Sequence, residues 1–320
     1  MKRATLWLWG RILVSGTVLG LVLLWMRRDI GRAWHLFAHV SWWAVAAATG
    51  LYVLAVVLAS ERLRQILSAY GIRLSLAVTT RLSMIGLFFN NVLPTGLGGD
   101  VVKAHCASRL SRRSAESYVA VLVDRLVGLT TIVGLATLAA VLSRHVRLNR
   151  WALLCGVLGV LGGLWLAWQA ASRYAPRAID AAMRRWHGLA RISPLVRLAE
   201  ALRARIFTTR RTLGVLGVSL ALQLLIIVSV FVLARGLALP ISLWQLLVVT
   251  PLIWSAAMVP SINGLGLREG AFVFFLGDSA GKDGAFALSM LWLAVITAVS
   301  LLGAPAYWMT NGARNHGGEQ

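Results

Sequence analysis

The chain is short of acidic residues, lysine and cysteine. Its 320 residues include 11 Asp and Glu against 32 Lys and Arg, and only Lys2, Lys103 and Lys282 are lysines. The two cysteines, Cys106 and Cys155, are too few and too far apart for a disulfide framework or a cysteine metal motif. Charged residues make up 13% of the chain. This small charged share excludes a soluble enzyme and a disordered protein.

Long hydrophobic runs fill most of the sequence. Hydrophobic residues account for 58% of the chain, and the mean hydropathy is +0.75. Because about 20 apolar residues cross a bilayer as a helix, the sequence predicts an all-α polytopic membrane protein. The six predicted full spans are residues 5–26, 40–60, 118–142, 151–171, 213–234 and 285–310.

Two further apolar stretches are interrupted. Residues 76–110 contain the break Asn90–Asp100, and residues 243–276 contain the break Pro260–Glu269. Glycine, proline and asparagine at this density end helical hydrogen bonding, which membrane depth tolerates only inside protein or beside a polar cavity. We therefore predict two re-entrant helical hairpins, the second followed by a polar turn at 277–284.

The placement of charge predicts the topology. Residues 172–212 carry ten arginines with apolar residues every three or four positions, typical of a basic amphipathic segment on the cytosolic surface. Counting spans outward gives cytoplasmic N- and C-termini and hairpins entering from opposite faces. Residues 40–142 and 213–310 then form two half-repeats of an inverted repeat within one membrane domain, a pattern that points to a midplane transport site.

Six ionisable residues fall at hydrophobic depth, where an unpaired charge is costly. They are Arg81, Asp100, Asp124, Arg125, Arg268 and Glu269. Neighbours on a helix point in different directions, so Asp124 and Arg125 need separate partners. We expect Arg125 to pair with Asp100 or Glu269, and Asp124 with Arg81 or Arg268. Two readings stay open: fixed ion pairs that clamp the hairpins, or a role in substrate binding or gating.

Glycine turns in both breaks are candidates for anion binding. Free backbone amides at broken helix ends can hold a phosphate, here beside Lys103 and Arg268; a plain packing turn is the alternative. We expect no metal ion or cofactor, because His35 and His39 lack a third ligand, and we identify no catalytic residue. The candidate substrate-binding residues are Arg81, Asn91, Gly96, Gly98, Gly99, Asp100, Lys103, Asp124, Arg125, Ser261, Asn263, Gly264, Gly266, Arg268 and Glu269.

Three motifs in order resemble a known family. They are Asn91-Val92-Leu93-Pro94-x-Gly96-x-Gly98-Gly99-Asp100 with Lys103, then Asp124-Arg125-x-x-Gly128, then Pro260-Ser261-x-x-Gly264-x-Gly266-x-Arg268-Glu269. Over residues 5–310 the chain resembles the lysylphosphatidylglycerol synthase transmembrane-region, or flippase-like, family. Asp124 stands where that family's pattern has Glu. The resemblance implies a bacterial inner-membrane protein with inverted halves, re-entrant helices and a lipid-accessible cavity. Full-length synthases add a cytosolic aminoacyl-transferase domain, which we do not find here, so lysyl transfer is not expected.

The function most consistent with these features is translocation, or binding for translocation, of an anionic lipid. The ligand would be a phospholipid or a polyprenyl-phosphate-linked molecule, and the high net charge of +21 suits such lipids. The alternative explanation of this positive net charge is that cytoplasmic loops of membrane proteins are ordinarily rich in Lys and Arg. One alternative is an integral-membrane transferase acting on a lipid-linked substrate, although the sequence makes a non-enzyme the better reading. Another is a non-transporting scaffold or regulator of lipid synthesis. Nucleic acid is not an expected partner, and a homo-oligomer is possible.

Overall fold

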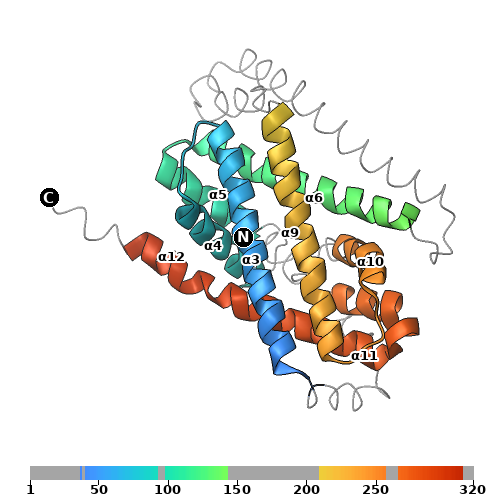
Figure 1. The fold of residues 1–320 in the computed structure, drawn as a ribbon. Coiled ribbons are helices and arrows are strands. Elements are labelled where there is room, and N and C mark those ends of the chain that lie inside the picture. The colour runs from blue at the N-terminus through green and yellow to red at the C-terminus, as the bar shows by residue number, and fades with distance from the viewer. Residues whose placement is uncertain (1–36, 38–39, 93–97, 143–208, 257–265, 313–320) are drawn as a thin grey trace, which may run out of the picture.

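The computed structural model describes residue 37 and residues 40–92, 98–142, 209–256 and 266–312. These residues form eight α-helices and no strand (Figure 1). The all-α prediction is therefore confirmed for this part of the chain. The helices are α3 (Trp42–Ala69), α4 (Leu76–Val92), α5 (Gly98–Ser111), α6 (Ser114–Leu142), α9 (Thr209–Gly236), α10 (Leu243–Ala256), α11 (Leu267–Leu301) and α12 (Gly303–Gly312).

Four stretches of these helices are long and apolar enough to cross a membrane. They are Trp42–Ala69, Ser114–Leu135, Arg211–Gly236 and Leu267–Tyr307. The predicted spans at 40–60, 118–142, 213–234 and 285–310 each fall on one of them. The predicted spans at 5–26 and 151–171, and nearly all of the basic segment 172–212, lie outside the described residues. Helix α3 continues to Ala69, almost ten residues beyond the predicted end of the first of these four spans.

The first interrupted stretch is a pair of packed helices, α4 and α5. The interruption is shorter than predicted, because Asn90 and Asn91 still belong to α4. Their side chains make tertiary contacts instead of breaking the helix. Asn90 Oδ1 accepts the Gly99 amide, and Asn91 Nδ2 donates to Ser300 Oγ of α11.

Gly99 allows α4 and α5 to pack closely. A Cβ at this position would lie 1.9 Å from the backbone oxygen of Gly86 and 2.6 Å from the Asn90 side chain. No side chain can occupy that space without moving the two helices apart. The glycine pattern in the first break is therefore explained, at Gly99, by helix packing.

The second interrupted stretch has α10 before the break and α11 after it. Leu267, Arg268 and Glu269 begin α11, so the break ends earlier than predicted. Gly266 precedes the helix with φ +85°, a conformation that favours glycine. The predicted polar turn at 277–284 corresponds to a kink at Gly281, which has φ 73° and ψ 154° and divides α11 into two parts.

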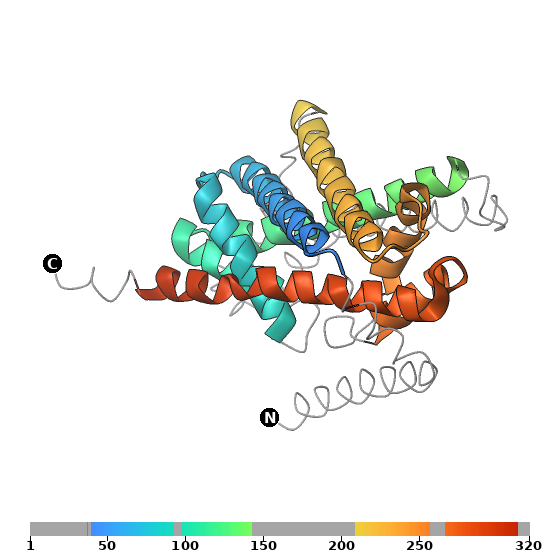
Figure 2. The same ribbon diagram turned by 60° about the horizontal axis from the view of Figure 1, so that its bottom comes forward.

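Helices α3 and α9 run side by side in opposite directions (Figures 1 and 2). The Ser41 amide at the start of α3 donates to the Gly236 oxygen at the end of α9, while Gly214 near the start of α9 lies beside Gln65. Each begins a series with the same order: a long helix, a short helix, a break, and then two helical segments. The two predicted half-repeats and their inverted orientation across a membrane stay a prediction.

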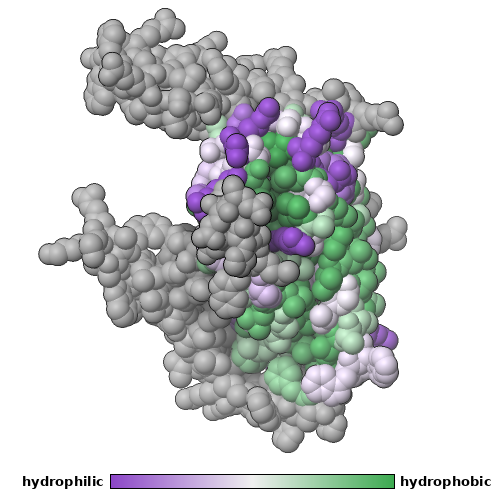
Figure 3. All heavy atoms as spheres, turned by 90° about the vertical axis from the view of Figure 1, so that its left-hand side faces the viewer, coloured by the Kyte–Doolittle hydropathy of each residue, from purple (hydrophilic) through white to green (hydrophobic). Residues whose placement is uncertain are grey.

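The surface shows a hydrophobic band below a hydrophilic upper end (Figure 3). At the end of the molecule where α3 ends and α9 begins, five exposed arginines gather: Arg73, Arg109, Arg112, Arg113 and Arg211. We call this the arginine end. At the start of α3, at the opposite end, Trp42 and Trp43 are 75% and 86% exposed. Exposed tryptophan at one end and arginine at the other are typical of the two edges of a membrane-embedded surface.

Candidate functional site

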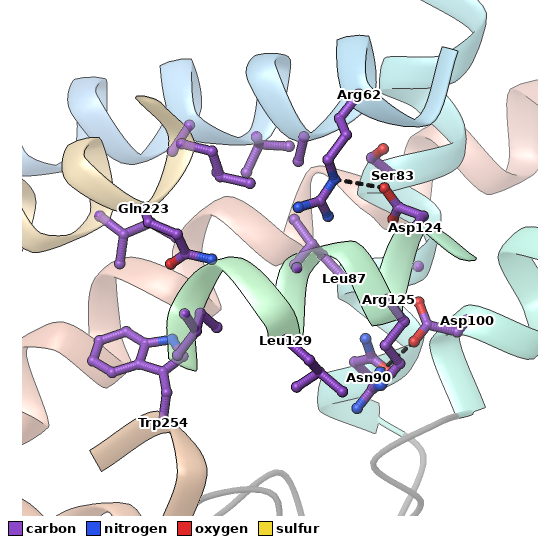
Figure 4. A pocket seen from close by; sticks show the side chains of 18 of the residues that line it. Arg62, Ser83, Leu87, Asn90, Asp100, Asp124, Arg125, Leu129, Gln223 and Trp254 are labelled. Atoms are coloured by element: carbon purple, nitrogen blue, oxygen red, sulfur yellow. Dashed lines mark hydrogen bonds and ion pairs between the residues drawn. The ribbon is translucent and has the colours of Figure 1, made fainter. Parts of the chain in front are cut away.

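A cavity of about 350 Å³, which we call the central cavity, lies among α3, α4, α5, α6, α9 and α10 (Figure 4). Five charged residues of the described chain line it: Arg62, Asp100, Lys103, Asp124 and Arg125. Four of these were predicted from the sequence as substrate-binding candidates, and the structure brings them together from helices α5 and α6.

The five charged groups form a chain of alternating sign. Arg62 Nε donates to Asp124 Oδ1 over 2.7 Å, and Lys103 Nζ lies 3.5 Å from Asp124 Oδ2. Lys103 Nζ also lies 3.1 Å from Asp100 Oδ1, and Asp100 Oδ2 accepts from Arg125 Nη1. Three cations against two carboxylates leave a formal surplus of one positive charge. An anionic ligand therefore finds a net attractive site without any change in protonation.

The partner of Asp124 differs from both predicted partners. Arg62 takes this place, together with Lys103, instead of Arg81 or Arg268. Arg62 is buried on α3 beyond the end predicted for that span, so hydropathy gave no reason to place it at depth. Its Nη1 also donates to Ser219 Oγ of α9 over 2.9 Å. One guanidinium thus connects α3, α6 and α9.

Gly128 makes room for this guanidinium. It lies four residues after Asp124 and therefore on the same face of α6, and a Cβ there would lie 3.2 Å from Arg62 Nη1. The Asp124-Arg125-x-x-Gly128 motif is explained in this way. Asp124 holds the Arg62 guanidinium, and Gly128 leaves space for it.

Arg125 also lines the cavity, and its side chain points toward Asp100 on α5 (Figure 4). Of the two partners expected for Arg125, the structure has Asp100. The Arg125 side chain is 32% exposed, against 8% for Arg62 and 11% for Lys103. Arg125 is therefore the most accessible of the three cations to a ligand.

The rest of the cavity wall is mostly apolar. Leu129, Ile132, Leu222 and Ile226 contribute aliphatic surface, and Trp254 of α10 closes this side. Gln223 lies on the same side, opposite the charged groups in Figure 4. Its side chain is buried, and the amide faces the cavity. The cavity therefore has a charged side and an apolar side, and the neutral Gln223 amide on the apolar side faces the charged groups.

Arg268 and Glu269 do not line the central cavity. Both are buried, and they pair with each other: Arg268 Nη2 donates to Glu269 Oε1 over 2.7 Å. Glu269 Oε2 also accepts the Gly266 amide over 2.6 Å. The predicted pairings of Glu269 with Arg125 and of Arg268 with Asp124 are therefore wrong. Glu269 is used locally, because its first-turn position lets it cap the start of α11.

The remaining predicted residues have mixed placements. Arg81 is exposed on α4 and does not line the central cavity, and its predicted position at hydrophobic depth stays a prediction. Asn91 reaches Ser300, and Gly98 begins α5. Gly96, Ser261, Asn263 and Gly264 lie outside the described residues.

Two glycine amides of the breaks already have acceptors within the chain. The Gly99 amide donates to Asn90, and the Gly266 amide donates to Glu269. Lys103 and Arg268, the cations expected beside a phosphate, are engaged by carboxylates. A phosphate at either of these amides would have to displace a side chain, whereas the central cavity is already open.

Comparison with known proteins identifies one family. Its model, described as the lysylphosphatidylglycerol synthase TM region, matches residues 8–303. This range covers most of the chain, including every helix that lines the central cavity. No curated protein and no solved structure gives a significant match.

Proposed function

Because the chain belongs to the lysylphosphatidylglycerol synthase TM region family, whose members are membrane proteins linked to lipid handling, we propose that it binds an anionic lipid in the central cavity and moves it between leaflets. The two ligand classes consistent with the sequence are a phospholipid and a polyprenyl-phosphate-linked lipid. Both combine a phosphate with long apolar chains.

One observation carries the proposal: the central cavity is charged on one side and apolar on the other. The charged side has the surplus cation that a phosphate requires, and Arg125 is its most accessible donor. Guanidinium groups bind phosphate through paired hydrogen bonds. Leu129, Ile132 and Trp254 offer the apolar surface along which the start of a lipid chain can lie.

Charge supports an orientation in the membrane. Loops facing the bacterial cytoplasm are enriched in Lys and Arg, which favours a cytoplasmic location for the arginine end. Trp42 and Trp43 then lie at the periplasmic interface of the inner membrane. The same orientation is compatible with cytoplasmic N- and C-termini, which stay a prediction because both termini lie outside the described residues.

A liposome assay tests the proposal. The purified protein is reconstituted with a trace of fluorescent phosphatidylglycerol or phosphatidylcholine, and the outer-leaflet probe is bleached with dithionite. We expect the protein to increase the bleached fraction of the anionic probe well above protein-free liposomes, with a smaller effect on the zwitterionic probe. A polyprenyl phosphate added as competitor shows whether the second ligand class uses the same cavity.

Arg125→Gln is the informative variant, because it removes the surplus positive charge. The matched control is Arg235→Gln, which removes an exposed arginine at the far end of α9. We expect only Arg125→Gln to slow exchange. Equal rates with and without protein would overturn the proposal, and a new lipid product would support the integral-membrane transferase instead.

A further inference from the structure

Helix α5 has a second cavity on its other side. Asp100 and Lys103 face the central cavity, whereas Val101, His105 and Arg109 line a separate groove of about 300 Å³. The groove is completed by Phe89 of α4, Tyr118 of α6 and Tyr307 of α12. We call it the α5 groove. Neither the family assignment nor the transport proposal gives it a role.

The arginine of the α5 groove lies at one end, and His105 lies midway between Arg109 and Val101. Arg109 is near the end of α5, four residues after His105 and on the same helical face. Tyr118, near the start of α6, adds a hydroxyl from the neighbouring helix. This end adjoins the arginine end, because Arg113, just beyond α5, donates to the Tyr70 oxygen at the end of α3.

The opposite end of the α5 groove is apolar. Val101 lies near the start of α5, about 12 Å along the helix from Arg109 at 1.5 Å per residue. Phe89 lies near the end of α4, and its ring packs edge-on against Tyr307 with centroids 5.1 Å apart. Val101 is 55% exposed. The groove therefore changes from cationic to apolar in the direction that leads away from the arginine end.

This gradient matches the direction of a lipid in the surrounding bilayer. Arginine at the edge of a membrane protein attracts anionic headgroups. The described residues that line the groove include an arginine and a histidine but no acidic residue. A headgroup phosphate at Arg109 would lie level with the other arginines of that end. A chain running inward would cover Val101 and the Phe89–Tyr307 pair.

We propose that the α5 groove binds one anionic phospholipid from the leaflet at the arginine end. The phosphate contacts Arg109 and His105, and one acyl chain lies against Val101, Phe89 and Tyr307. This lipid is distinct from the one that the central cavity carries. By packing on the outer face of α5, it supports the helix that holds Asp100 and Lys103 in the central cavity.

The test measures lipid that remains bound to the purified protein. The protein is titrated in detergent with phosphatidylglycerol, and bound lipid is counted by native mass spectrometry. Arg109→Gln is compared with Arg112→Gln, because Arg112 is also exposed but does not line the groove. We expect Arg109→Gln to weaken the binding of one lipid about fivefold, the effect of one arginine near anionic lipid, and Arg112→Gln to leave it unchanged.

Cys106 gives a local second measurement, because its side chain also lines the α5 groove. In a Cys155→Ser background, phosphatidylglycerol should slow alkylation of Cys106, while phosphatidylcholine and inorganic phosphate should have much smaller effects. Protection by phosphate alone would show an anion site and overturn the lipid proposal. Equal protection by both lipids would show that the groove does not select an anionic headgroup and would overturn the proposed contact with Arg109. Because Arg125→Gln leaves this groove intact, loss of transport in that variant and loss of groove binding are separable results.

Discussion

Arg62 and Asp124 are 62 positions apart in the sequence and are joined by a 2.7 Å hydrogen bond from Nε to Oδ1. Both side chains are only 8% exposed. The bond connects α3 to α6, and the same guanidinium reaches Ser219 of α9. A buried pair of this kind gives little net stability over an apolar pair, but breaking it leaves a charge that the interior cannot solvate. The pair therefore makes the arrangement of three helices depend on two side chains.

Removing Asp124 should be more damaging than removing Arg62. Asp124→Ala leaves two cations, Arg62 and Lys103, without their shared carboxylate. We expect it to lower the free energy of unfolding by at least about 3–5 kcal/mol, the range for breaking a buried pair. Arg62→Ala should cost less, because Lys103 still faces Asp124. Thermal unfolding of the purified proteins in detergent, followed by tryptophan fluorescence, ranks the variants.

Arg64→Ala is the matched control for this comparison. Arg64 is on the same helix and pairs with Glu61, but its side chain is 41% exposed. Surface pairs contribute about 0–1 kcal/mol, so this variant should unfold close to wild type. If Arg64→Ala and Asp124→Ala were equally destabilising, burial of the charged groups would not explain the loss in free energy of unfolding.

Gly99→Ala should separate α4 from α5. The added Cβ would lie 1.9 Å from the Gly86 oxygen, which belongs to backbone and cannot rotate away. We expect a large loss of monodisperse protein in size-exclusion chromatography. Gly134→Ala in α6 is the control, because nothing lies within 4 Å of its added Cβ. Alanine there should be neutral or stabilise the helix by up to about 1 kcal/mol. Normal folding of Gly99→Ala would show that the two helices can move apart freely.

The sequence predicted the positions of the helices better than the contacts between them. Apolar length located four spans, and glycine with proline located both interruptions, because these features act on the local backbone. The bond between Asn90 and Gly99 was not predictable in the same way. Asparagine favours a break in isolation, yet here its side chain accepts an amide from the next helix.

Charge pairing was only partly predictable for a similar reason. Asp100 and Arg125 were recognised as candidate partners, but Arg62 was missed because it lies where an arginine ordinarily extends toward the membrane edge. Gly128 was the one feature of the sequence that could have indicated a large partner for Asp124. A glycine one turn after a buried acid leaves space for a large partner, although it does not say which helix supplies it. Likewise, nothing in the order Arg268-Glu269 shows that these neighbours pair with each other.

Neutralising Glu269 should affect folding more than ligand binding. Glu269→Gln keeps an oxygen that can accept the Gly266 amide but removes the charge that balances Arg268. Because Arg268 is buried, we expect a loss of about 3–5 kcal/mol. Adding Arg268→Met should recover part of it, since the unpaired charge is then removed as well. Thermal unfolding of the two single variants and the double variant checks this. Additive losses would mean that the two residues do not act as a pair.

Gln223 provides the sharpest test of where an anionic ligand lies. It faces the central cavity from α9, opposite the charged chain (Figure 4). Gln223→Glu preserves its shape but cancels the surplus positive charge, so we expect about tenfold weaker binding of phosphatidylglycerol, consistent with charges several ångströms apart in a protein interior. Gln223→Leu removes hydrogen-bonding capacity without adding charge and should weaken binding less.

Gln245→Glu adds the same charge on the partly exposed start of α10, away from the cavity, and should bind like wild type. Binding is measured by native mass spectrometry on variants that unfold at the wild-type temperature. Because the α5 groove binds the same probe, the variants are compared in the Arg109→Gln background, where we expect the groove to bind about fivefold more weakly. Wild-type affinity in Gln223→Glu would exclude the anion from the central cavity, since a full negative charge inside it could not leave a bound phosphate unaffected.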